Sequence, residues 1–373
     1  MGDPKLLLTS YVSWALLESG VPADRLAKSL AYIRAQAPAA ENAYILALAA
    51  NALTAASTTD KDAGKILETV LARLDQRSEE KPEWQARCFP AADGESLNHA
   101  RGNSLTVETT ALAALALLKS TNPEANVKAQ KALAYLAKAR DPHGTWGSTQ
   151  ATILALKALV AASSAPKQTT PAKFSILVDG KEIAKGEVNS ANSDVMQQFD
   201  LSAAVSNSGD HKVLISVDGE SAMVAQLVSR YYRPWSSASR PKQRFDLKVD
   251  YDRTTLEADQ TIQAKASLRY LADRPTSMVM LDLGIPPGFT ADADDWNKLV
   301  ASNQVKKFSM TNRQIIVYLQ DIEPGKEYAF TYTLKAKFAV KAKAPAAEAY
   351  EYYNPTERGA SQPVDIEVKQ KGN

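Results

Sequence analysis

The chain has 373 residues, of which 45% are hydrophobic and 23% are charged, as in a globular protein. This length exceeds one ordinary hydrophobic core, so two or three domains are expected. The formal net charge is only +2, which argues against nucleic acid or an anionic membrane as a partner, because both require a strong positive field.

Candidate metal ligands and thiols are few. Cys88 is the single cysteine, so no internal disulfide is predicted. The three histidines, His99, His143 and His211, lie far apart in the sequence. The usual zinc sites are excluded for lack of thiolates, and neither a metal nor a cofactor is expected.

The N-terminal residues contain one early lysine and then a mixed amphipathic pattern. They lack the compact apolar stretch and cleavage site of a signal peptide. No apolar run approaches the roughly 20 residues that a membrane-spanning helix needs. The sequence therefore predicts neither a signal peptide nor a membrane span in this chain.

Residues 4–163 are rich in alanine and leucine and have almost no strand pattern. Seven helices are predicted, at 6–19, 23–36, 41–56, 62–76, 106–119, 125–140 and 149–163. Four segments, which start at Thr9, Asn42, Val107 and Ser148, are apolar nearly all round, as is typical of buried helices. Amphipathic helices alternate with them. This alternation predicts repeated helical hairpins that form part of an α/α toroid.

The last of these helices follows the turn sequence Gly-Thr-Trp-Gly-Ser-Thr-Gln. Gly144 and Gly147 permit positive φ angles on either side of Trp146, whose indole is expected to be buried. Ser148 is a candidate helix cap, and Gln150 can also bond free N–H groups. We favour this structural interpretation over a catalytic loop, because the sequence identifies no catalytic partner for the turn.

From about Ala172 the hydrophobic period changes to two. Asp179-Gly180 and Asp218-Gly219 each separate two β-prone runs and predict hairpins. A Ser/Pro/Arg-rich linker is predicted at 234–244. A second β region follows, in which alternation over several strands predicts an antiparallel β-sandwich, interrupted by one helix at 292–303. Three segments carry this alternation: Phe245 to Tyr251, Ile262 to Tyr270, and Tyr328 to Leu334.

Several of these segments resemble one known family. VETTALAALALLKS, from Val107, and GTWGSTQATILALKAL, from Gly144, resemble the end of the thioester domain of the α2-macroglobulin and complement family. NKLVASNQVKKFSMTNRQIIVYLQDI, from Asn297, resembles the helix and next strand of that family's receptor-binding domain. AYEYYNPTE and the later VDIEV resemble its final strands. The resemblance covers essentially the whole chain and preserves domain order.

This resemblance implies a multidomain α plus β fold. Residues 1–165 are expected to form a partial α/α toroid like a thioester domain. Residues 166–233 are expected to be the C-terminal half of a CUB-type β domain. Residues 234–244 are the linker, and 245–373 are expected to form a receptor-binding-type β-sandwich.

The chain departs from the family at the thioester. The family's Cys-Gly-Glu-Gln motif, in which a thiolate attacks the Gln side chain, is absent. Cys88 lies in ARCFPAAD without a Gln three residues later, so it is interpreted as a lone thiol. Because seven helices make only part of the family's ring, we expect the C-terminal piece of a larger protein. Its parent either carries the thioester or is a bacterial relative without it.

A second family with an α/α toroid offers an alternative. ARDPHGTWGS resembles the Q-x-x-D-G-x-W repeat of terpene cyclases, and Asp292, Asp294 and Asp295 match their D-x-D-D acid motif. That motif must lie inside the helical cavity, where a buried Asp stays protonated. Here it falls in the C-terminal β region, where the acids are better explained as N-terminal helix charges.

Three lysines, Lys298, Lys306 and Lys307, suggest a receptor-binding surface, because animal members present a lysine pair on this helix. Here the matching turn has Asp294, Asp295 and only Lys298, so a solvated face is the favoured interpretation. The absence of paired cysteines and of N-glycosylation motifs also fits a bacterial member.

The function that the resemblance implies is endopeptidase inhibition by conformational entrapment, in an extracellular or periplasmic parent protein. This chain would supply moving domains and perform no chemistry. Its partners would be target peptidases, through the parent, and the rest of the macroglobulin chain; membrane association is not evident. The alternatives are a toroid enzyme with β modules and a helical-repeat binding module of the cell envelope.

Overall fold

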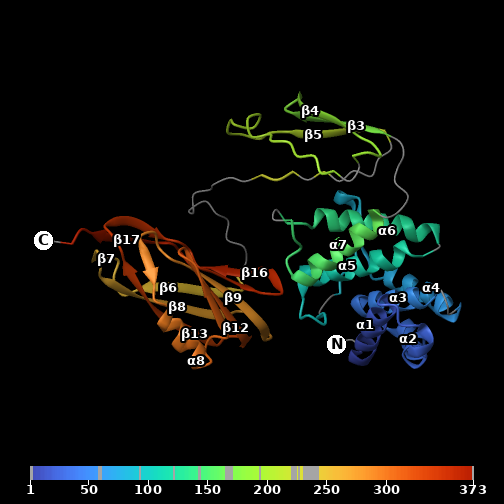
Figure 1. Ribbon diagram of the computed structural model, residues 1–373, viewed down its shortest axis with the longest axis horizontal. Coiled ribbons are helices and arrows are strands. Elements are labelled where there is room, and N and C mark those ends of the chain that lie inside the picture. The colour runs from blue at the N-terminus through green and yellow to red at the C-terminus, as the bar shows by residue number, and fades with distance from the viewer. Residues whose placement is uncertain are drawn as a thin grey trace.

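The computed structural model has a helical part followed by β-structure (Figure 1). The helical domain comprises the described residues between 3 and 163, and the β-sandwich comprises residues 243–371. A small sheet lies between them in the sequence. The structure describes residues 3–57, 61–91, 94–120, 122–141, 144–163, 171–192, 195–219, 225, 227–229 and 243–371.

All seven predicted helices of the helical domain are confirmed. They are α1 (Pro4–Glu18), α2 (Ala27–Gln36), α3 (Ala43–Ala56), α4 (Lys61–Asp75), α5 (Gly102–Leu118), α6 (Pro123–Lys138) and α7 (Thr149–Ser163). Short 3₁₀ turns precede and follow α2. Asp3 and Asn42 cap α1 and α3 by accepting backbone N–H bonds at 2.9 Å from Lys5 and Tyr44. Helix α5 begins four residues before the predicted start, because polar residues in its first turn hide the apolar period.

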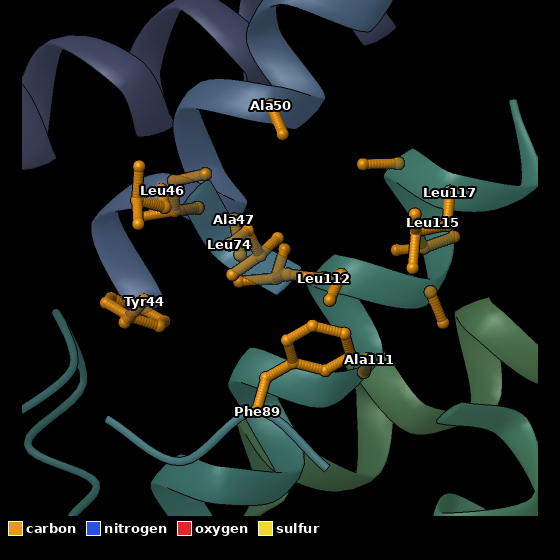
Figure 2. Close-up of a cluster of buried hydrophobic side chains, with 14 of the residues drawn as sticks. Tyr44, Leu46, Ala47, Ala50, Leu74, Phe89, Ala111, Leu112, Leu115 and Leu117 are labelled. Atoms are coloured by element: carbon orange, nitrogen blue, oxygen red, sulfur yellow. The ribbon is translucent and has the colours of Figure 1, made fainter. Parts of the chain in front are cut away.

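The helices form two layers. Helices α1, α3, α5 and α7 pack in that order as an inner row, and α2, α4 and α6 lie outside it (Figure 1). Alanines at the contact let α3 and α5 approach closely. Figure 2 shows Ala47 of α3 beside Leu112 of α5, within one cluster of buried side chains. The predicted pattern of inner and outer helices is therefore present.

The prediction that all four inner helices are buried all round is wrong for the two at the ends of the row. Helix α1 exposes Leu8 and Val12 by 52% and 50%, and α7 exposes Ile153 and Val160 by 53% and 62%. Helices α3 and α5 are buried because an inner helix packs on each side of them. The end helices have such a neighbour on one side only within the described residues.

A small hairpin that the sequence analysis did not predict lies between α4 and α5. It consists of β1 (Glu79–Lys81) and β2 (Ala86–Cys88), joined by a 3₁₀ turn at Pro82–Trp84. Strand β2 packs on α6 and α5. Just after it, the Phe89 N–H donates to Thr110 Oγ1 of α5 at 3.0 Å. The Phe89 ring lies beside Ala111 of α5 (Figure 2).

The small sheet has the order β4-β3-β5, with β3 at Ala172–Val178, β4 at Lys181–Val188 and β5 at Val213–Asp218. The hairpin at Asp179-Gly180 is confirmed, and both turn residues have positive φ, 50° and 83°. The strand expected after Asp218-Gly219 falls largely on 220–224 and 226, outside the described residues. The linker predicted at 234–244 also lies outside them, except for its last two residues.

The β-sandwich contains three sheets, with strand orders β10-β13-β8-β6, β11-β12-β9-β15-β16 and β14-β17-β7. Neighbouring strands are antiparallel except for β17 and β7, which are parallel. Helix α8 (Ala293–Ala301) follows β10, as predicted. The strands are β6 (Phe245–Tyr251), β7 (Thr255–Glu257), β8 (Thr261–Tyr270), β9 (Thr276–Gly284), β10 (Phe289–Ala291), β11 (Lys307–Met310), β12 (Gln314–Ile322), β13 (Glu327–Ala336), β14 (Val340–Ala344), β15 (Glu348–Glu351), β16 (Asn354–Ala360) and β17 (Val364–Lys369).

The sandwich core follows the predicted alternation. Every second residue of β8 from Ile262 to Tyr270 is buried, and so are Phe330, Tyr332 and Leu334 of β13. Trp296 of α8 is fully buried, with its ring 5.2 Å from that of Tyr332. This indole anchors α8 to the sheet that contains β13.

Candidate functional site: the contact between the helical domain and the β-sandwich

The helical domain contacts the β-sandwich at the N-terminal end of α5. The loop of residues 95–101 and the start of α5 lie against two parts of the sandwich, the β15–β16 turn and the loop before β9. Strand β16 points toward the helices in Figure 1. We call this region the docking contact.

Arg101 links the two sides of the docking contact. Its Nε donates to Glu95 Oε2 at 3.0 Å, and its Nη2 also bonds that oxygen. Its Nη1 donates to the Pro275 carbonyl oxygen of the sandwich at 3.2 Å. Burial tends to raise the pKa of Glu95, but the bonds from Arg101 and His99 outweigh it, so the pKa lies below its usual value. Glu95 therefore holds the guanidinium as a charged, oriented donor.

Two glycines allow the backbones to approach. Gly102 has φ +53°, and a Cβ there would lie 2.7 Å from Nδ2 of Asn354 in the sandwich. Gly147 has φ +84°, and a Cβ there would lie 3.4 Å from Cγ of Pro355. Both positions favour glycine for its conformational freedom, and Gly102 also because of the space that Asn354 occupies.

Aromatic rings continue the docking contact. The His99 ring lies 5.9 Å from the Tyr353 ring, which in turn contacts Tyr352 edge-on at 5.0 Å. His99 has φ 63°, and its Nδ1 pairs with Glu95. The tyrosine pair of the AYEYYNPTE segment thus lies at the contact.

A buried carboxyl lies on the sandwich side. Glu351 is 8% exposed, and the Tyr270 hydroxyl donates to its Oε1. Burial raises the pKa of Glu351, while Tyr270, Arg101 and Arg244 act in the opposite direction. Arg101 thus acts electrostatically on Glu351 across the docking contact. Sequence patterns did not reveal Glu95, Arg101 or Glu351, because single charged residues in loops carry no periodic signal.

The Trp-Gly-Ser-Thr-Gln turn has the predicted structural character. Trp146 is 2% exposed, and its Nε1 donates to the Leu136 carbonyl oxygen at 2.6 Å. Gly144 and Gly147 have φ angles of 87° and 84°. Ser148 Oγ accepts from the Ala151 N–H at 3.1 Å, and thus fills the capping role that was also considered for Gln150.

Cys88 is buried at the end of β2 and is a free thiol. Burial raises its pKa, and Lys81 acts in the opposite direction. A thiol with a raised pKa is a poor nucleophile. This environment is that of an inert core thiol.

The acidic triad that matches the cyclase motif belongs to the sandwich. Asp292 caps α8 by accepting from the Asp294 N–H at 2.9 Å, and Asp295 Oδ2 accepts from the Thr333 N–H at 2.9 Å. Both carboxylates thus accept bonds from backbone N–H groups. The N–H group that bonds Asp292 belongs to the first turn of α8, where negative charge is stabilising. The structure therefore supports the helix-charge interpretation.

The three candidate lysines are exposed on α8 and around β11. Lys298 lies 3.6 Å from Asp295, and Lys307 Nζ lies 5.8 Å from the Tyr318 ring centre. The structure does not join them with Lys306 into a site around one ligand. Within the described ranges, no group of His, Cys, Asp or Glu side chains is arranged to hold a metal ion. Nor is any described helix long and apolar enough to cross a bilayer.

Layered helical hairpins docked on a β-sandwich define the class of the chain, the C-terminal region of a macroglobulin-type protein. Family models described as the A-macroglobulin TED domain and the A-macroglobulin receptor binding domain match residues 2–161 and 274–362. The chain belongs to the α-macroglobulin and complement family.

Relatives and solved structures agree with this assignment. The chain is 26% identical to complement C3 of Oncorhynchus mykiss over 94% of its length, and 24% identical to thioester-containing protein 1 of Anopheles gambiae over 93%. It spans 21% and 24% of those relatives' lengths. By fold it is similar to Escherichia coli α2-macroglobulin from domain MG7 to the C-terminus, with a TM-score of 0.62 and 12% identity over 98% of this chain and 54% of that one. A Salmonella α2-macroglobulin mutant gives a TM-score of 0.61 at 11% identity, over 98% of this chain and 22% of that one.

Proposed function

We propose that this chain is the moving C-terminal part of a longer protein that inhibits peptidases by entrapment. Cleavage of the parent by a peptidase would separate the helical domain from the β-sandwich and enclose the peptidase. The chain itself performs no chemistry in this proposal, and Cys88 forms no thioester. The parent would be extracellular or periplasmic, and bacterial.

The observation that carries the proposal is the docking contact. Two domains of the macroglobulin family meet through one oriented arginine, two glycines and a few rings, rather than through a continuous hydrophobic core. The apolar clusters of the two domains are separate. Domains joined by a small, polar contact are expected to move relative to each other. A change in the parent can therefore separate them without unfolding either.

The proposed parts follow the domain order of the family. Residues 1–165 would be part of the thioester domain, 166–233 part of the CUB-type domain, and 245–373 the receptor-binding-type domain. Residues 234–244 would be the linker that precedes the sandwich. Lys298, Lys306 and Lys307 would form a solvated face rather than a receptor site.

The enzyme alternative is not favoured, since its acidic triad lies on α8 of the sandwich. The binding-module alternative gains no specific support either.

The test uses the longer protein that contains this chain, incubated with an endopeptidase. Entrapment leaves the peptidase active on a small chromogenic peptide and protects a large protein substrate. Loss of both activities would indicate blockage of the peptidase active site and contradict entrapment. If both activities persist, the protein is not a peptidase inhibitor.

A further inference from the structure

A buried carboxyl inside the helical domain is not explained by the proposed function. Glu108 lies in the middle of α5 and has no exposed surface. Ser148 Oγ donates to its Oε1 at a long distance of 3.4 Å, and its Oε2 forms no hydrogen bond with the described residues. An ionised carboxylate in such a site would lack the hydrogen bonds and the countercharge that it normally requires.

The groups that face Glu108 come from three elements. Tyr44 at the start of α3 and the hydroxyl of Ser96 lie beside it, and Ser148 approaches from the turn before α7. Among the described residues, no cation shifts the pKa of Glu108. Tyr44 is the titratable group whose charge interacts with that of Glu108. Burial raises the pKa of Glu108 to about 7, and the hydroxyl groups of Ser96 and Ser148 only partly oppose this.

Both serines belong to segments that reach the docking contact. Ser96 Oγ accepts from the Asn98 and Ala100 N–H groups at 3.2 and 3.1 Å, which organises the loop that carries His99 and Arg101. Ser148 follows Gly147, which lies against Pro355 of the sandwich. Glu108 is thus the side chain between the two segments of the helical domain that meet the sandwich.

We propose that Glu108 is a protonation-controlled tether: its neutral carboxyl holds residues 94–101 and 144–148 together, and its ionisation loosens both segments. A neutral carboxyl can donate a hydrogen bond to one serine and accept one from the other. The carboxylate can only accept, and it stays buried without a cation. Docking of the sandwich should therefore weaken as the pH rises through neutrality. The inference concerns this chain alone and does not depend on peptidase trapping.

The direction of this pH dependence follows from the linkage between proton binding and opening. The closed state binds the Glu108 proton more tightly than an opened state, in which the carboxyl has its ordinary pKa of 4.5. Opening is therefore promoted as the pH rises from that value to about 7 and levels off above it. If opening fully solvates the carboxyl, the opening constant increases roughly 70-fold between pH 5 and pH 8.

The test is hydrogen exchange of the wild-type chain and of Glu108→Gln at pH 5 and pH 8, corrected for intrinsic exchange. Glutamine keeps the shape and cannot ionise. We expect protection of 94–101 and 144–152 to fall by tens of fold in the wild type and to stay nearly constant in Glu108→Gln. Glu124→Gln, at an exposed position on α6, is the matched control and should behave as wild type.

Equal protection at the two pH values in the wild type would overturn the proposal, as would the same pH dependence in Glu108→Gln. If that variant does not fold, carboxyl NMR of Glu108 in the wild type decides. Titration near neutrality supports the tether, and titration at the ordinary value rejects it.

Discussion

Arg101 of the helical domain donates a 3.2 Å hydrogen bond to the carbonyl oxygen of Pro275 in the β-sandwich. The same guanidinium is held from behind by Glu95. The bond therefore comes from a pre-oriented donor, which loses little side-chain entropy when the domains dock. This relationship makes Arg101 the first target for mutation.

Arg101→Ala should weaken docking without unfolding either domain. The change removes the bond to Pro275 and leaves Glu95 without its guanidinium partner, at an expected cost of about 1–3 kcal/mol to docking. Small-angle scattering should show a larger radius of gyration, and exchange should increase in the β15–β16 turn. Arg25→Ala serves as the control, because Arg25 is exposed and far from Arg101 in the sequence. An unchanged radius would mean that Arg101 does not hold the domains together.

Gly102→Ala should also loosen the docking contact. A Cβ at this position would meet the Asn354 side chain at 2.7 Å, and the backbone has a positive φ. Gly20→Ala separates the two effects, because Gly20 has φ +89° but no atom within 4 Å of the added Cβ. We expect both variants to lose some stability, and only Gly102→Ala to increase the radius of gyration. The same radius of gyration in both variants would show that the Asn354 side chain moves aside without weakening the docking contact.

Trp146→Ala should destabilise the helical domain by about 3–5 kcal/mol, as is usual for removal of a buried aromatic ring. The change also leaves the Leu136 carbonyl oxygen without its indole donor. Urea unfolding followed by circular dichroism measures the loss. Trp84, which is 38% exposed, provides the matched Trp84→Ala control with a much smaller effect. A small loss for Trp146→Ala would indicate that the turn is not a structural anchor.

Glu351→Gln should stabilise the β-sandwich at neutral pH and have little effect in acid. Burial raises the pKa of Glu351 above its ordinary value of 4.5, so the folded state binds the proton more tightly than the unfolded state. Ionisation therefore costs stability as the pH rises through the window above 4.5. Glutamine avoids this cost and can still accept the Tyr270 bond. The melting temperatures of the wild type and of Glu351→Gln at pH 4 and pH 8 measure the difference in stability. A variant that is less stable than the wild type at pH 8 would contradict the prediction.

Cys88 should form no thioester. Its thiol is buried, its pKa is raised, and Ala91 stands where the family motif has glutamine. The intact mass should equal the sequence mass, methylamine should add nothing, and iodoacetamide should label Cys88 only after denaturation. A mass deficit of one ammonia that methylamine reverses would refute this prediction.

Periodic patterns predicted much of the fold. The Leu/Ala pattern identified all seven helices of the helical domain, and the alternation from Phe245 identified strands and the buried face of β8. The small β1–β2 hairpin was missed because its strands have three residues each, too few for a period. The exposure of Leu8 and Val12 was missed because composition indicates an apolar helix but not how many neighbours it has.

The site was less predictable than the fold. Trp146 and its two glycines stood out because tight turns need particular residue types. Arg101, Glu95 and Glu351 did not, because a single charged residue carries no pattern. Their roles depend on contacts that only the folded chain makes, such as the bond from Arg101 to Pro275. Glu108 was hidden for another reason: it is one polar residue in an otherwise apolar helix, and sequence alone does not show which way it faces.

The most direct test of the central claim is a distance measurement in the longer protein before and after peptidase cleavage. Spin labels at Glu124→Cys on α6 and Lys298→Cys on α8 report the separation of the helical domain from the β-sandwich, since both positions are exposed and Cys88 is buried. Entrapment by moving domains predicts one defined distance before cleavage and a new, clearly different distance after it. An unchanged distance in a sample that has trapped its peptidase would contradict the account.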